Sequence, residues 1–175
     1  MTLAHISDTH LGFRAYSRTS RGGFNQREVD VMRTFESALD AIAEREPDLV
    51  IHAGDLFHVV RPSNATIVQA YRLISRLQDR RGGKPLVVVG GNHDTPKVSD
   101  SGNILNLFGT IPGVHIASRD LETIELGEVE VTCVPSEALG SSSGDLYLPR
   151  TGLPNRVLAL HGMARQVLPD HGEFA

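Results

Sequence analysis

A chain of 175 residues, 40% hydrophobic and 22% charged, has the composition of one folded domain with a substantial core, which excludes a disordered chain. Its formal net charge of -4 shows no basic excess, so net charge gives no argument for a nucleic-acid partner. The single cysteine excludes an internal disulfide framework. The chain starts without a basic leader and no segment approaches the roughly 18 apolar residues of a membrane span, so we expect a cytoplasmic protein with no membrane partner.

Four short apolar segments are typical of strands covered on both faces. They are Leu3 to Ser7, Leu49 to Ala53, Leu86 to Gly90 and Val157 to Leu160. Helical spacing of apolar residues separates the first three segments, over residues 26–45 and again after Ser63 and Asn64, which suit a helix cap. The alternation of strand and helix predicts an α/β fold with a parallel core.

The pattern changes after residue 120. Residues 121–126 and 129–134 alternate polar and apolar around Gly127-Glu128, which predicts a two-residue hairpin in an antiparallel portion or a second sheet. Cys133 falls in this pattern, where we expect a buried and inert thiol. Residues 136–149 are rich in glycine and serine and predict a mobile surface loop.

A polar motif follows directly on each of the four apolar segments. The motifs are Asp8-Thr9-His10, Gly54-Asp55-Leu56-Phe57-His58, Gly91-Asn92-His93-Asp94 and His161-Gly162. In parallel sheets, ligands bind beyond the carboxyl ends of the strands, where residues distant in sequence meet. Asp, Asn and His are the ligands of two cations that together neutralise phosphoryl oxygens and make a nucleophile from water. The four motifs therefore predict a two-metal phosphoesterase centre.

The first two motifs supply candidate ligands. Asp8 and His10 are two residues apart at the end of an extended segment, so both side chains can point to the same side. Asp55 follows a glycine that permits a tight turn, and its carboxylate can bridge two ions. Taken singly, each has a plainer interpretation: a chance Asp-x-His, and an Asp that caps the following turn.

The third motif offers three different groups on one tight loop. Asn92 can ligate through its carbonyl oxygen, and His93 can stand beside the ions and protonate the leaving oxygen. Asp94 can fix the tautomer and orientation of His93. The alternative interpretation is an Asx turn with a surface histidine.

These residues resemble the calcineurin-like metallophosphoesterases. The resemblance is carried by residues 6–12, 52–58 and 91–94. The Leu-Gly after His10 and the Leu-Phe-His after Asp55 are similar specifically to the SbcD-type DNA double-strand-break repair nucleases. The resemblance covers nearly the whole chain, which corresponds to an amino-terminal nuclease portion of the family. It implies a two-sheet sandwich flanked by helices.

The resemblance also implies a ligand set and residue roles. Asp8, His10 and Asp55 would hold the first divalent ion, and Asp55, Asn92 and His161 the second. The implied ion is manganese, which also suits mixed carboxylate, amide and imidazole ligands. His93 would donate the proton with help from Asp94, and His58 would help place the scissile phosphodiester. The implied partners are DNA, a second copy of the chain and an SMC-like ATPase of the SbcC type.

The chain departs from the family pattern in one respect. The family closes its site with a later Gly-His-x-His, whereas this sequence reaches Ala175 with only His171 after His161. Each ion would lack one imidazole, so we expect weaker metal binding. We also expect a single domain over residues 1–175 that lacks the carboxyl-terminal part of the family domain, and an incomplete second sheet.

An arginine-containing loop lies between His10 and the first helix. It contains Arg14, Arg18 and Arg21, interleaved with Phe13, Tyr16 and Phe24. Guanidinium groups beside aromatic rings suit a nucleic-acid backbone and an unstacked base, whereas the alternative is a solvated loop.

The favoured hypothesis is a manganese-dependent DNA exonuclease and endonuclease in double-strand-break repair. Two alternatives remain open. One is a phosphatase or cyclic-nucleotide phosphodiesterase of the same superfamily. The other is a non-catalytic interaction module, which the absent Gly-His-x-His would favour.

Overall fold

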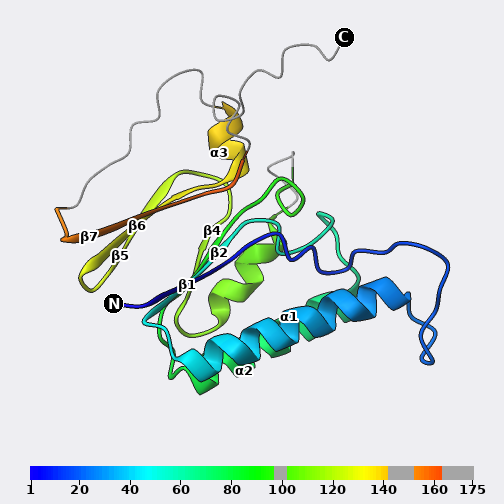
Figure 1. Ribbon diagram of the computed structural model, residues 1–175. Coiled ribbons are helices and arrows are strands. Elements are labelled where there is room, and N and C mark those ends of the chain that lie inside the picture. Colours follow the sequence, from blue (N-terminus) through cyan, green and yellow to red (C-terminus); the bar gives the residue numbers. More distant parts are fainter. Residues whose placement is uncertain (97–101, 142–151, 163–175) are drawn as a thin grey trace, which may run out of the picture.

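A four-stranded parallel sheet forms the centre of the molecule (Figure 1). The computed structural model describes residues 1–96, 102–141 and 152–162. The strands are β1 (Leu3–Ile6), β2 (Leu49–Ala53), β3 (Leu86–Val89) and β4 (Val114–Ala117), hydrogen-bonded in that order. This arrangement confirms the predicted parallel α/β core.

Two long helices, α1 (Gln26–Arg45) and α2 (Asn64–Arg80), lie side by side along one face of this sheet (Figure 1). Asn25 caps α1 by accepting from two backbone amides, and the Ser63 hydroxyl accepts from the amide of Thr66 at the start of α2. Their apolar faces bury Phe35, Leu39, Ile74 and Leu77, among others, against Val50 and Val88 of the sheet. The predicted bounds of α1 and the capping role of Ser63 are confirmed, whereas Asn64, the other expected capping residue, is the first residue of α2.

A second, three-stranded sheet covers the other face. It contains β5 (Glu122–Leu126), β6 (Val129–Val134) and β7 (Asn155–Leu160), with β5 antiparallel and β7 parallel to β6. Gly127 and Glu128 join β5 to β6, so the predicted hairpin is confirmed. Cys133 lies fully buried between the sheets, and burial, followed by the charge of Glu122, raises the pKa of its thiol to about 12. The molecule is thus a two-sheet sandwich flanked by helices.

One expectation about this half of the chain is wrong. The segment Val157 to Leu160 belongs to the second sheet, and Leu158 and Leu160 are exposed, so it is not a core strand covered on both faces. The fourth core strand is β4, which follows the 3-10 helix η2 (Ile104–Thr110). The polar His115 in the middle of β4 interrupts the apolar run that would have revealed it.

The predicted loop over residues 136–149 begins as a short helix, α3 (Ser136–Ser141). Glu137 in its first turn favours helix initiation despite the glycine at position 140. Residues 142–149 lie outside the described part of the chain. No helix in the described ranges has both the length and the hydropathy to cross a membrane.

Candidate metal centre

The loops that follow β1 and β2 are joined by backbone hydrogen bonds. The amide of Asp8 donates to the carbonyl of Gly54 at 3.0 Å, and that of His10 donates to the carbonyl of Asp55, also at 3.0 Å. Asp8, His10 and Asp55 have φ values of 54°, 45° and 55°, a left-handed conformation that is uncommon for side chains of this kind. Backbone strain of this sort clusters at functional sites.

The conformation of the first loop corrects one expectation. Strand β1 ends at Ile6, and Asp8 and His10 lie beyond it in left-handed backbone. The side chains of Asp8 and His10 therefore do not reach the same side through the alternation of an extended strand. The turn itself brings them together, because ligand atoms of Asp8, His10 and Asp55 lie within 4.8 Å of one another.

Asp55 lies at the centre of the candidate site. Its Oδ1 accepts a hydrogen bond from the backbone amide of His93 at 2.9 Å. Its Oδ2 is 3.7 Å from Nε2 of His10 and 3.5 Å from Nε2 of His161. A single carboxylate oxygen therefore lies between two imidazoles, the position that a bridging ligand of two ions requires.

His161 reaches the site from the end of β7 in the second sheet. Its backbone amide donates to the carbonyl of Val134, and its Nδ1 donates to the carbonyl of Ala53 at 2.8 Å. A carbonyl only accepts, so in the neutral ring the proton is on Nδ1 and Nε2 carries the lone pair. This Nε2 is 3.2 Å from Oδ1 of Asn92.

These separations suit metal ligands. Two donor atoms at roughly 2.1 Å from one ion and at right angles to each other are about 3 Å apart. The groups that meet here are two oxygens, of Asp55 and Asn92, and the imidazole of His161. The structure thus brings together the five side chains expected as ligands: Asp8, His10, Asp55, Asn92 and His161.

Two glycines leave room for this arrangement. A Cβ on Gly54, whose φ is 98°, would collide with the ring of His161, and a Cβ on Gly91 would collide with Oδ1 of Asp55. Gly54 directly follows the buried strand β2, and Gly91 closely follows the buried strand β3. Because neither glycine has a side chain, His161 and Asp55 can approach the backbone there.

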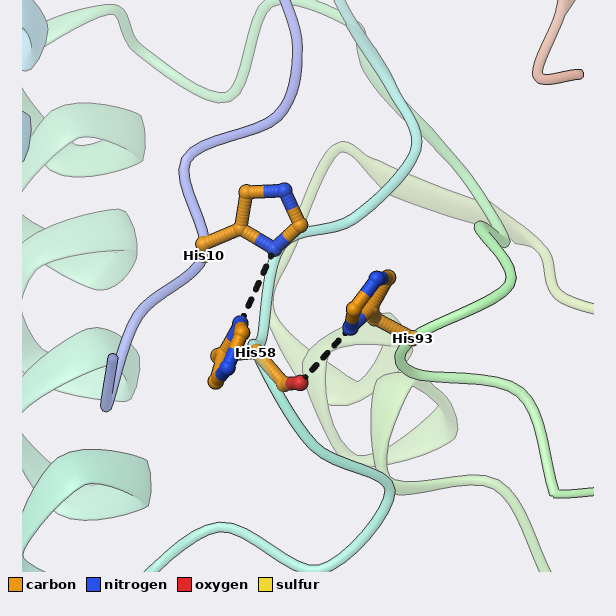
Figure 2. Close-up of side chains that lie close together, drawn as sticks. All are labelled: His10, His58 and His93. Atoms are coloured by element: carbon orange, nitrogen blue, oxygen red, sulfur yellow. Dashed lines mark hydrogen bonds between the residues drawn. The ribbon is translucent and has the colours of Figure 1, made fainter. Parts of the chain in front are cut away.

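Three imidazoles gather beside these ligands (Figure 2). The Nδ1 atoms of His10 and His58 are 3.5 Å apart, and Nδ1 of His93 donates to the carbonyl oxygen of His58 at 2.9 Å. In the neutral His93 ring, Nε2 is therefore the nitrogen free to exchange a proton. Burial, together with the neighbouring His10 and His93, lowers the pKa of His58.

Asp94 differs in its contacts from what the sequence predicted. Its Oδ1 accepts from the amide of Gly91 at 2.8 Å, and its Oδ2 accepts from the amides of Leu56 at 2.6 Å and Phe57 at 3.4 Å. The hydrogen bond that orients the His93 ring comes instead from His58. Burial raises the pKa of Asp94, and these amide donors oppose that rise. Asp94 therefore joins the second and third loops.

The predicted substrate-binding arginines occupy different environments. Nε of Arg14 donates to Oε2 of Glu28 at 2.8 Å, whereas Arg18 and Arg21 lie exposed on the small turn around the Thr19–Asn25 bridge. Tyr16 and Phe24 are exposed there too, with 88% and 54% of their surface accessible. The ring of Phe13 packs edge-on against His58, so it is less free than Tyr16 and Phe24 to stack on a base.

No sequence pattern indicated the residues that support Arg14. Glu28 is buried in the first turn of α1, and its Oε1 accepts from the hydroxyl of Thr66 in α2 at 2.9 Å. Both residues occupy ordinary helical positions, where a charged or hydroxyl side chain is usually solvated. Only the contact between α1 and α2 shows that they hold a guanidinium beside the site.

Comparison with known proteins identifies the class. The family described as calcineurin-like phosphoesterase matches residues 1–171, and the chain belongs to this family. The DNA double-strand break repair protein Mre11 of Saccharolobus solfataricus is 30% identical over 98% of this chain and 44% of its own length. Mre11 of Sulfurisphaera tokodaii is 31% identical over 98% of this chain and 43% of its own length.

This chain therefore spans less than half the length of the curated relatives that it matches. Among solved structures, the nuclease MPE of Pseudomonas putida aligns with a TM-score of 0.40 and 15% identity, over 74% of this chain and 52% of the other.

Proposed function

We propose that the chain is a metal-dependent DNA nuclease, an exonuclease and endonuclease that hydrolyses phosphodiesters in double-strand-break repair. The observation that carries this proposal is Oδ2 of Asp55, which lies between the imidazoles of His10 and His161. The similarity to relatives named as DNA double-strand break repair proteins supports DNA as the substrate.

The ligands divide into two sets that share Asp55. Asp8, His10 and Asp55 would hold the first ion, and Asp55, Asn92 and His161 would hold the second. We take the ions to be manganese. Carboxylate, amide and imidazole ligands together suit manganese better than they suit a cation that binds only oxygen. When bound, the two ions neutralise the phosphoryl oxygens and lower the pKa of water.

His93 is the proposed general acid. Its Nδ1–H donates to the carbonyl of His58, so the ring keeps one orientation, and in the protonated ring Nε2–H can pass its proton to the departing oxygen and leave the neutral imidazole. His58 helps place the scissile phosphodiester. Asp94 is a positioning residue, because it acts through the amides of the loops that carry Asp55 and Asn92.

The neighbouring surface suits a polymer. A groove beside His58 is lined by Arg14 and Arg61, and Arg18 and Arg21 are exposed further along the loop that carries Arg14. Arg14 is held at its Nε by Glu28, while its side chain remains 61% exposed, so its terminal nitrogens can meet a phosphate. We propose that these arginines contact the DNA backbone.

We further propose that residues 1–175 act as one nuclease domain in the cytoplasm, as a homodimer with an SMC-like ATPase of the SbcC type. Co-purification with a tagged ATPase of that type and light scattering test these two associations.

The test of the proposed function is cleavage of end-labelled linear duplex DNA in manganese, with Asp55→Asn as the inactive comparison. We expect cleavage by the unmodified chain and none by the variant. Hydrolysis of a small aryl phosphodiester without any cutting of DNA would instead indicate a phosphatase or a cyclic-nucleotide phosphodiesterase. Calorimetric titration that finds no manganese binding at millimolar metal would indicate a non-catalytic module.

A further inference from the structure

The three clustered imidazoles, His10, His58 and His93, form a group distinct from the two ligand sets above. His10 is the only residue that this group shares with those ligand sets. One ligand atom from each of the three rings lies within 4.8 Å of the other two, although the rings come from three separate loops (Figure 2). We propose that these histidines bind a single zinc ion, and that zinc held there blocks the two-metal centre.

The spacing of the rings suits one tetrahedral ion. Zinc binds imidazole nitrogens at roughly 2.0–2.1 Å, which places two tetrahedral ligands about 3.3 Å apart. The Nδ1 atoms of His10 and His58 are 3.5 Å apart. The ring centroid of His93 is 4.8 Å from that of His10 and 5.2 Å from that of His58.

One ring must turn for all three nitrogens to face the ion. The planes of His58 and His93 are within 24° of parallel, and nearly parallel rings cannot both aim a lone pair at a point between them. His93 is held through its Nδ1 by the carbonyl of His58, which leaves Nε2 as its ligand atom. The His58 ring is therefore the one that turns, so that its Nδ1 and Nδ1 of His10, now 3.5 Å apart, both face the ion.

The chemistry of the set selects the metal. It contains three imidazoles and no carboxylate, and a site with three protein nitrogens and one open position is typical of zinc. Manganese gains least from imidazole ligands and lies at the weak end of the order of divalent affinities. The same loops thus present an oxygen-rich centre for manganese and a nitrogen-only centre for zinc.

Occupation of the three-histidine site has a functional consequence that rests on the proposed function. Zinc would remove His10 from the first ion. It would also occupy Nε2 of His93, which could then no longer donate a proton. Zinc would therefore inhibit hydrolysis even when the second ion, held by Asp55, Asn92 and His161, stays bound.

Two matched substitutions separate the sites. His58→Gln removes an imidazole from the zinc set alone, and His161→Gln removes one from the manganese centre alone. Zinc affinity is measured on the metal-free chain by competition with a chromophoric chelator, and manganese binding by calorimetry. We expect His58→Gln to weaken zinc at least about tenfold, since even an outer-shell partner contributes roughly 10- to 100-fold to metal affinity. Zinc also binds mixed oxygen and nitrogen sites more tightly than manganese does, so we expect His161→Gln to weaken manganese and to leave unchanged the zinc equivalent that His58→Gln weakens.

Zinc affinity unaffected by His58→Gln, or lost equally in both variants, would overturn the proposal. Circular dichroism on heating shows whether either variant has unfolded, and His93→Gln provides a second member of the zinc set if His58→Gln has. Failure of the proposed function gives a different result: manganese does not bind, while the zinc difference between the two variants persists.

Discussion

The free nitrogen of each imidazole decides what that residue can do. In His161 and His93 the Nδ1 proton is engaged by a backbone carbonyl, of Ala53 and His58 respectively, so both rings present Nε2. The two residues differ in what Nε2 faces, because that of His161 lies beside oxygens of Asp55 and Asn92. We therefore propose the same kind of side chain as a ligand in one place and as a proton donor in the other.

Replacing His93 by alanine tests the assignment of the general acid. We expect manganese binding to stay largely intact and turnover on DNA to fall by about 100-fold or more, the usual size of general acid catalysis. An aryl phosphodiester with a good leaving group needs less protonation, so its turnover should fall less. His115→Ala in β4 is the control. Equal losses on both substrates, or a parallel loss of metal, would contradict the role.

His52 should make the stability of the metal-free chain depend on pH. Burial lowers its pKa from 6.5 to about 4, despite the opposing charge of Asp8. The unfolded chain binds the proton first, so the free energy of unfolding should fall as the pH drops from 6.5 through 4, by up to roughly 3 kcal/mol.

Urea unfolding in a chelating buffer measures this dependence. Nε2 of His52 pairs with the hydroxyl of Thr9 at 2.9 Å, and a glutamine amide can make the same bond. His52→Gln should therefore lose less stability than the unmodified chain over this pH range. Identical pH profiles for the two proteins would show that another group is responsible.

Among the helices and strands, the ends of the strands contribute more to the candidate site than the strand interiors do. β2 and β3 are fully buried, and their apolar sequences say only that both faces are covered. The glycines that follow them, Gly54 and Gly91, let the chain turn directly beside a ligand. α1 and α2 were predictable because each has a cap and a single apolar face, which are local properties.

Gly91→Ala tests the close approach at the end of β3. The added Cβ would meet Oδ1 of Asp55, so the carboxylate must move away from its place between His10 and His161. We expect weaker manganese binding by calorimetry, and a loss of about 1–3 kcal/mol in the free energy of unfolding, as for other overpacked sites.

Gly140→Ala in α3 is the matched control, because no atom lies within 4 Å of the position that its Cβ would take. It should bind manganese as the unmodified chain does. Normal binding by Gly91→Ala would show that the Asp55 carboxylate has another place from which to ligate.

At the scale of the whole molecule, the candidate centre joins the two sheets. Asp8, Asp55 and Asn92 follow strands of the parallel sheet, whereas His161 follows β7 of the other sheet and bonds back to the carbonyl of Ala53. A metal bound by both groups would link the sheets in the native state only, and ligands that bind only the native state stabilise it.

Manganese should therefore raise the melting temperature. At about 100 times its dissociation constant an ion adds about 2.7 kcal/mol, which for a chain of this size corresponds to roughly 5–10 °C. Calorimetric melting with manganese and with a chelator measures the shift. In His161→Gln the link between the sheets is lost, so we expect a clearly smaller shift. An undiminished shift would place the stabilising ion on the parallel sheet alone.

The parts of the fold that depend on neighbours in the chain were predictable from the amino-acid sequence. These are the two capped helices, the hairpin at Gly127, and the four polar motifs that follow apolar segments, because periodicity, caps and turn residues act over a few positions. The tertiary structure alone decided the rest. It showed that Val157 to Leu160 joins the second sheet, that Asp94 bonds to loop amides instead of His93, and that Glu28 supports Arg14. Each of these depends on which elements pack together, and long-range contacts leave no periodic signal in the sequence.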